Sequence, residues 1–168
     1  MIELKKYIRS MKPASVNEIK QKLKETDKKE LIEICQRLAR FKKENKELLT
    51  FLLFEEDDLP EYIKNVKEEI DEGFVQVNTS SIYFAKKTIR KVLRIANKHI
   101  RYTGSKTAEA EILLHYLTNF KGLNLHWQKS TALVNLYKNQ LKKIDAVIAT
   151  MHEDLQYDYQ GEIERLKI

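Results

Sequence analysis

Cysteine, proline and glycine are scarce in this sequence, which has 1 Cys, 2 Pro and 4 Gly among its 168 residues. A single cysteine excludes a disulfide framework and every zinc motif that needs several cysteines. So few glycines and prolines argue against a β-rich fold, because such folds need many tight turns. No apolar run approaches the ~20 residues of a transmembrane helix, and residues 1–8 lack the apolar centre of a signal peptide. We therefore expect a cytoplasmic protein.

Apolar residues are nevertheless abundant, at 42% of the chain, and they recur with the three- and four-residue spacing of amphipathic helices. The length fits one domain of ~100–200 residues. The sequence therefore predicts an all-α fold, either an irregular helical bundle or a short α-solenoid of about six to eight helices. We expect a single helical domain over residues 1–168, in which residues 1–25 form a peripheral N-terminal helix pair.

Capping residues and breaks in the apolar periodicity place these helices along the chain. Ser15 and Glu18 have the spacing of a capping box, and Asp58 and Ser105 are N-cap residues. The expected helices cover residues 2–11, 15–25, 27–53, 58–73, 81–102, 105–121 and 129–157, with a short tail helix after Gly161. The helix over residues 27–53 either continues without a break or kinks near Glu44 and Asn45.

Charge is distributed in blocks that the net value of +6 conceals. Residues 51–78 carry 2 basic and 9 acidic groups, whereas residues 79–106 carry 8 basic groups and no acidic group. Within the acidic block, Leu52–Phe54 ends the longest apolar run, and the carboxylates of Glu55–Asp58 follow it. Four adjacent carboxylates repel one another, which favours a turn at that point.

The helix expected over residues 81–102 concentrates cations on one face, opposite its apolar stripe, because they step by three or four residues. This cationic face comprises Lys87, Arg90, Lys91, Arg94, Lys98 and Arg101, with Lys86 beside it. Like charges at this spacing destabilise a helix by ~0.2–0.5 kcal/mol per pair. Another interaction must offset that repulsion.

Three interpretations fit the cationic face. The carboxylates at residues 61–72 belong to the preceding, antiparallel helix and can pair with it, which is the interpretation we favour. Alternatively, the face binds an anionic partner, either nucleic-acid phosphates or an acidic protein. A membrane surface is a third option, although the apolar stripe is aliphatic and suits a protein core.

No arrangement of residues points to catalysis. Residues 101–107 resemble a phosphate-binding loop but lack its second glycine and preceding strand, so we favour an ordinary capped turn. Glu111 and His115 lie one turn apart without a Glu-x-x-His pattern, which favours hydrogen bonds between helices over a metal site. Cys35 lies in an apolar stripe and is predicted to be a small core residue. We expect no metal, no cofactor and no enzyme activity.

Trp127, the only tryptophan, lies in a loop between two expected helices. An exposed tryptophan would be a candidate anchor for a partner protein. A large aromatic side chain in such a loop can also close the end of a hydrophobic core. We favour the core position and keep Trp127 as the candidate partner anchor.

Three segments give the chain a resemblance to a known family: DKKELIE at residues 27–33, KELLTFLL at residues 46–53 and AKKTI at residues 85–89. With them, residues 15–120 resemble a family of bacterial helical proteins classified as a domain of unknown function. The resemblance implies a bacterial, cytoplasmic, all-α protein. It brings no catalytic residues with it.

Together these patterns predict a non-enzymatic helical domain that binds another protein. The alternative is nucleic-acid binding through the helix over residues 81–102. A further alternative is a small-molecule enzyme whose pocket is formed by residues distant in sequence.

Overall fold

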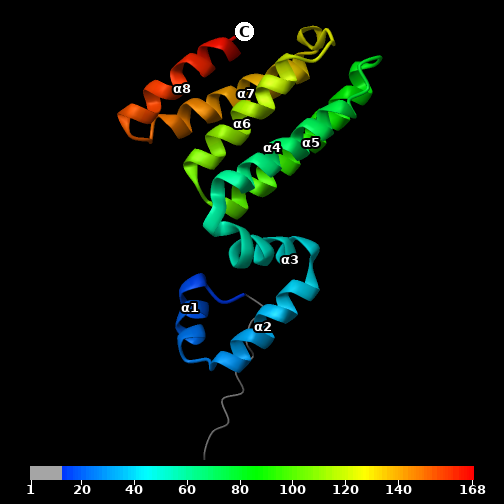
Figure 1. Ribbon diagram of the computed structural model, residues 1–168. Helices are drawn as coiled ribbons and strands as arrows, with labels where there is room; N and C mark the ends of the chain where they lie inside the picture. The colour runs from blue at the N-terminus through cyan, green and yellow to red at the C-terminus, as the bar shows by residue number, and fades with distance from the viewer. Residues whose placement is uncertain (1–12) are drawn as a thin grey trace, which may run out of the picture. The chain divides into compact units, whose positions relative to one another are not determined.

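The computed structural model describes residues 13–168, and every regular element in that range is helical (Figure 1). The predicted all-α fold is therefore confirmed. The helix expected over residues 2–11 lies outside the described residues. The chain divides into two compact units, Met1–Leu49 and Thr50–Ile168. The single domain expected over residues 1–168 stays a prediction.

Helices α1 (Val16–Lys24) and α2 (Lys28–Phe41) of the first unit begin at the expected caps. The backbone N–H of Glu18 donates to Ser15 Oγ at 3.3 Å, and the Glu18 carboxylate accepts from the Ser15 N–H at 2.8 Å. Asp27 caps α2 by accepting a backbone N–H three residues on, at 2.9 Å. Both donors would otherwise lack a partner within their helix, which explains why the chain turns helical at these residues.

The expected kink near residues 44–45 is a complete break between α2 and α3 (Lys43–Thr50), slightly earlier in the chain. Lys42 has an extended backbone, with φ −143° and ψ 144°. Asn45 reaches back across the break, and its Nδ2 donates to the carbonyl of Leu38 at 3.0 Å. That bond satisfies a carbonyl at the end of α2 that has no helical partner.

The predicted core position of Cys35 is wrong, because its side chain is exposed. None of the described helical residues up to Leu49 is buried. Even the apolar stripe of α1 remains largely open, with Val16 84% exposed. Helices of 9 and 14 residues carry amphipathic stripes but too little side-chain volume to enclose a core.

The second unit begins with two irregular turns, the π-helical η1 (Phe51–Glu55) and the 3-10 turn η2 (Glu56–Asp58). Longer helices follow. They are α4 (Leu59–Val75), α5 (Ile82–Thr103), α6 (Lys106–Lys121), α7 (Thr131–Ile148) and α8 (Glu153–Leu166), with the 3-10 turn η3 (Trp127–Lys129) before α7.

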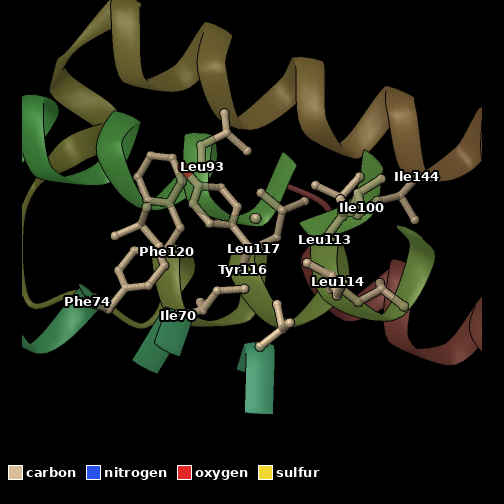
Figure 2. Packing of buried hydrophobic residues seen from close by; sticks show 14 of the residues in the cluster. Ile70, Phe74, Leu93, Ile100, Leu113, Leu114, Tyr116, Leu117, Phe120 and Ile144 are labelled. Carbon is tan, nitrogen blue, oxygen red and sulfur yellow. The ribbon is translucent and has the colours of Figure 1, made fainter. Parts of the chain in front are cut away.

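Helix α6 is the centre of the second unit and packs against α4, α5, α7 and α8. Its buried side chains are Ala108, Ala110, Ile112, Leu113, Leu114, Tyr116, Leu117 and Phe120. Figure 2 shows Phe74 of α4 beside Tyr116, with ring centroids 5.3 Å apart. The helix predicted over residues 105–121 is confirmed. Its buried residues lie on more than one face, because neighbouring helices surround α6.

The apolar stripes expected for α4 and α5 also lie in this core. On α5 the buried residues are Ala85, Ile89, Val92, Leu93, Ala96 and Ile100. Gly73, expected near the end of its helix, lies inside α4, where a Cβ would stand 2.7 Å from Cγ2 of Val92. The glycine therefore permits a close approach of α4 and α5.

The long helix expected over residues 129–157 is two helices, α7 and α8. The chain turns after Ile148, and the side chain of His152 caps α8 by accepting the Asp154 N–H at 3.4 Å. Both helices pack on α6, so their apolar spacing continues across the turn. The periodicity in the sequence therefore gives no sign of the turn. Gly161 lies within α8 rather than before a separate tail helix.

Replacing Gly73 by alanine tests the close approach of α4 and α5. In an open helix this substitution stabilises by up to ~1 kcal/mol, whereas forcing a methyl group into a packed contact costs ~1–3 kcal/mol. We expect Gly73→Ala to lower the free energy of unfolding in the natural chain. In a Val92→Ala background, the same substitution should raise it. Urea unfolding followed by Trp127 fluorescence measures both, and equal effects in the two backgrounds would contradict the close approach.

Tyr137 makes the stability of the second unit sensitive to alkaline pH. Its hydroxyl donates to the Leu166 carbonyl at 2.8 Å, and burial raises the pKa of Tyr137 to about 12. An unfolded tyrosine ionises near ~10, so folding favours the neutral phenol. The contribution of Tyr137 to the free energy of unfolding should be fully present below about pH 10. It should be lost as the pH rises from about 10 towards 12.

The variant Tyr137→Phe has no proton to lose at this position. It should be less stable at neutral pH by ~0.5–1.5 kcal/mol, because the bond to Leu166 is lost. Its unfolding free energy should also fall less steeply above pH 10, although burial raises the pKa of Tyr116 as well. Urea titrations at several alkaline pH values measure how steeply the free energy of unfolding falls with pH. Equal slopes for the variant and the natural protein would show that Tyr137 does not cause the loss of stability.

Candidate functional site

The cationic face expected on residues 81–102 lies on α5. Of its seven cations, five are exposed, and Lys86 and Lys98 are half-buried. The opposite side of α5 is buried in the core. The charges therefore stand on the side of the helix that does not carry the α4 and α6 contacts.

The carboxylates of α4 that lie at helix interfaces are directed to other partners. Glu69 Oε2 lies 2.9 Å from Nε2 of His99, near the end of α5. Asp71 Oδ1 lies 2.6 Å from Nε2 of His115 and accepts from Nδ2 of Asn119 at 2.8 Å, both on α6. These bonds fix α4 against its two neighbours through histidine and asparagine.

The favoured pairing of α4 with the cationic face is not formed at six of its seven positions. Glu61 of α4 pairs instead with Lys64 in its own helix, at 3.0 Å, and this hydrogen bond raises the pKa of Lys64. Within residues 13–168, no ion pair is formed by Lys86, Lys87, Arg90, Lys91, Arg94 or Arg101. The physical reason is geometric, since α4 and α5 meet through their apolar stripes.

A groove of about 670 Å³ runs between α5 and α7. Its lining, which defines the α5–α7 groove, consists of Tyr83, Lys86, Lys87, Arg90, Leu93, Arg94, Asn97 and Leu136. Four of these side chains are cations and none is a carboxylate. Tyr83 of α5, 70% exposed, and the half-buried Leu136 of α7 supply apolar surface beside the charges, whereas Leu93 is buried in the core. The structure thus brings part of the cationic face together with apolar residues that the sequence alone did not connect to it.

Lys143 of α7 lies at one end of this groove. Its Nζ donates to Oδ1 of Asn97 at 3.2 Å and pairs with Glu109 of α6 at 2.8 Å. The charge of Lys143 is thereby neutralised inside the protein. By contrast, Lys91 and Arg101 lie on exposed α5 surface outside the groove lining.

Trp127 belongs to the core, so its role as a candidate partner anchor is wrong. Its side chain is fully buried. The indole stacks on Tyr137, with centroids 5.0 Å apart and planes at 23°, and it contacts Phe120 at 5.0 Å. Its Nε1 is buried without an acceptor among the described residues. A buried side chain has no surface to offer a partner.

The segment at residues 101–107 is the capped turn that we favoured over a phosphate loop. Gly104 ends α5 with φ 57°, a left-handed conformation that glycine adopts without strain. Ser105 then caps α6 by accepting the Ala108 N–H at 3.3 Å. Lys106 donates to Oγ1 of Thr150 at 2.8 Å, which ties this turn to the end of α7.

Glu111 and His115 take part in hydrogen bonds between helices, as expected. Glu111 accepts from Lys67 of α4 at 2.7 Å, while His115 bonds Asp71. Over the described part of the chain, no group of three or more His, Cys, Asp or Glu side chains is placed to hold a metal ion. No helix there is long and apolar enough to cross a membrane.

Comparison with models of protein families, with curated proteins and with solved structures finds no match to this chain. The functional argument therefore rests on the geometry of the α5–α7 groove. Sequence reasoning located its four cations but missed Tyr83, Leu93, Asn97 and Leu136 as lining residues. No sequence signal connects Leu136 to α5, because the pairing of the two helices is a tertiary contact.

The double variant Arg90→Gln, Arg94→Gln tests whether the groove cations lack internal partners. We expect its unfolding free energy to be unchanged or higher by ~0.2–0.5 kcal/mol, since a repulsive pair one turn apart is removed. The matched control Lys67→Gln loses the contact with Glu111 and should be less stable by up to ~1 kcal/mol. Urea unfolding compares the two, and a loss of stability in the arginine variant equal to the control's would reveal a structural role.

Proposed function

We propose that this protein is a non-enzymatic binding module that holds an acidic segment of a protein partner in the α5–α7 groove. The observation that carries the proposal is the combination of four cations, no carboxylate and the apolar surface of Tyr83 and Leu136 in one groove. Carboxylates of a partner offset the repulsion among the cations, while its apolar side chains cover Tyr83 and Leu136. Charge complementarity of this kind steers association and selects the partner.

The apolar lining favours a protein segment over a phosphate chain. Phosphates interact with Arg90 and Arg94 but leave the apolar surface of Tyr83 and Leu136 in contact with water. A peptide that alternates carboxylates with apolar side chains satisfies both kinds of surface. The groove volume of about 670 Å³ suits a few side chains of one segment.

Nucleic-acid binding is the second candidate, and the exposed cations beyond the groove support it. Lys91 and Arg101 continue the row along α5, whose 22 residues extend over about 33 Å. A linear row of exposed cations is a common electrostatic footprint for phosphates. This candidate uses the whole helix face, whereas the acidic segment uses the groove.

A bacterial origin and a cytoplasmic location belong to the same proposal. The resemblance of residues 27–33, 46–53 and 85–89 to a bacterial helical family supports the origin. The scarcity of cysteine is compatible with a reducing compartment.

Fluorescence anisotropy with a labelled peptide of alternating glutamate and leucine tests the proposed function. We expect binding at low salt. The variant Arg90→Gln, Arg94→Gln should weaken it by roughly 2- to 30-fold, since an exposed ion pair contributes ~0.2–1 kcal/mol and 1.4 kcal/mol is a tenfold change. Leu136→Ser should weaken it further, and Lys142→Gln is a control that removes an exposed cation outside the groove lining.

A labelled duplex in the same assay separates the two candidates. The affinity for the duplex should fall steeply with salt: the logarithm of the binding constant, plotted against the logarithm of the salt concentration, should have a slope near −0.9 per phosphate contacted. The substitution Leu136→Ser should leave this affinity unchanged. Peptide binding that depends on Leu136 supports the protein partner. Duplex binding without peptide binding would replace the proposal with nucleic-acid recognition, and binding of neither probe would refute the groove as a site.

A further inference from the structure

The segment Leu52–Asp58, which spans most of η1 and η2, exposes both apolar and acidic side chains. Phe54 is 80% exposed, Leu53 67% and Leu52 44%, although all three are large and apolar. Glu56 and Asp57 directly after them are exposed as well. Large apolar side chains in succession on a surface are characteristic of interaction sites.

The π-helical backbone of η1 produces this exposure. The Glu56 N–H bonds the carbonyl of Phe51, one residue further back than in an α-helix. Phe51 is buried against Tyr62, with ring centroids 4.6 Å apart, while the following three residues turn outwards. Single π-turns of this kind occur frequently at functional sites.

The acidic groups of this segment have no cationic partner within the described part of the chain. Glu55, Glu56 and Asp57 form no ion pair there. Asp58 is an N-cap, and its carboxylate accepts the Glu61 N–H at 3.2 Å. The chain therefore carries an acidic, apolar segment and a cationic, apolar groove, neither of which has a partner among residues 13–168.

The two features are complementary in charge and in apolar content. The groove offers Tyr83 and Leu136 among four cations, and the segment offers two or three apolar side chains followed directly by carboxylates. Both lie in the second unit, Thr50–Ile168. This complementarity is more specific than attraction between two charged surfaces, because apolar and charged groups match at once.

The segment cannot reach the groove of its own chain. Phe51 packs on Tyr62, which bonds Nδ1 of His99 at 2.7 Å on the side of α5 that faces α4. The groove lies on the side of α5 that faces α7, where Asn97 bonds Lys143. Since α5 is one continuous helix over Ile82–Thr103, it separates the two features.

We infer that the occupant of the α5–α7 groove is the segment Leu52–Asp58 of a second copy of this chain. This inference rests on the proposed function, because it names the acidic partner. Phe54 and Leu53 of one copy cover Tyr83 and Leu136 of the other. Glu55, Glu56 and Asp57 then face the groove cations, and each copy completes the site of its neighbour.

Such a contact joins two different surfaces, so it is heterologous. Each copy that donates its segment keeps an empty groove, and each copy that accepts keeps a free segment. Repetition gives either a closed ring or an open chain of copies. Association should therefore give either a closed oligomer, the smallest being a reciprocal dimer, or chains that lengthen as the protein concentration rises.

Two variants of the full chain test the inference, each defective in one surface. The groove variant is Arg90→Gln, Arg94→Gln, and the segment variant is Phe54→Ser, Glu56→Gln. The natural protein should sediment at low salt as species heavier than 19.9 kDa, in proportions that rise with concentration. Each variant alone should remain monomeric. Their equimolar mixture should form a 1:1 complex, because one intact segment then meets one intact groove.

Circular dichroism and Trp127 fluorescence establish that both variants are folded. A natural protein that stays monomeric at every concentration, or a mixture that fails to associate, would overturn the inference. Binding of a labelled peptide of residues 51–59, measured beside the alternating glutamate–leucine peptide, tests the inference separately from the proposed function. If the alternating glutamate–leucine peptide binds the groove but the 51–59 peptide does not, the groove takes another partner. If neither binds, both the inference and the proposed function fail.

Discussion

The enclosure of α6 is the constraint on which the second unit depends. Four helices contact it, and it buries residues on more than one face, from Ala108 to Phe120. Each surrounding helix must therefore turn its apolar stripe inwards, which leaves its polar side outwards. For α5 the consequence is direct: burying Ile89 and Ala96 fixes the rotation of the helix and places its cations away from α4.

Two helices that are adjacent in sequence and opposite in charge need not form ion pairs with each other in the folded protein. The acidic α4 and the basic α5 are antiparallel neighbours, yet they meet through apolar residues and the close approach at Gly73. The polar contacts at the edges of the interface use Glu69 with His99 and Asp71 with His115. Partly buried hydrogen-bonded pairs hold a fixed geometry, whereas pairs between long exposed side chains contribute little. The net charge of adjacent blocks is thus a poor guide to what neutralises a helix.

Periodicity and caps were sufficient to locate most helices, because both are local properties. Ser15, Asp58 and Ser105 start helices by satisfying backbone N–H groups within three residues. The division between α7 and α8 was missed because both helices face α6. The exposure of Cys35 was missed because a stripe shows which side is apolar but not whether anything covers it. The groove lining combines α5 residues with Leu136 of α7, and only the tertiary structure places these two helices side by side.

The exposed surfaces of the second unit differ in what they can contribute to a complex. Burial of Phe54 or Leu53 would contribute up to ~1.5–3 kcal/mol per side chain, and their exposure leaves this hydrophobic free energy ungained. A repulsive pair such as Arg90 and Arg94 costs only ~0.2–0.5 kcal/mol. Most of the free energy of filling the α5–α7 groove must therefore come from apolar contact with Tyr83 and Leu136. The cations increase the rate of association and favour an acidic partner. Carboxylates placed opposite them offset the repulsion among the cations, which no carboxylate of the groove lining offsets.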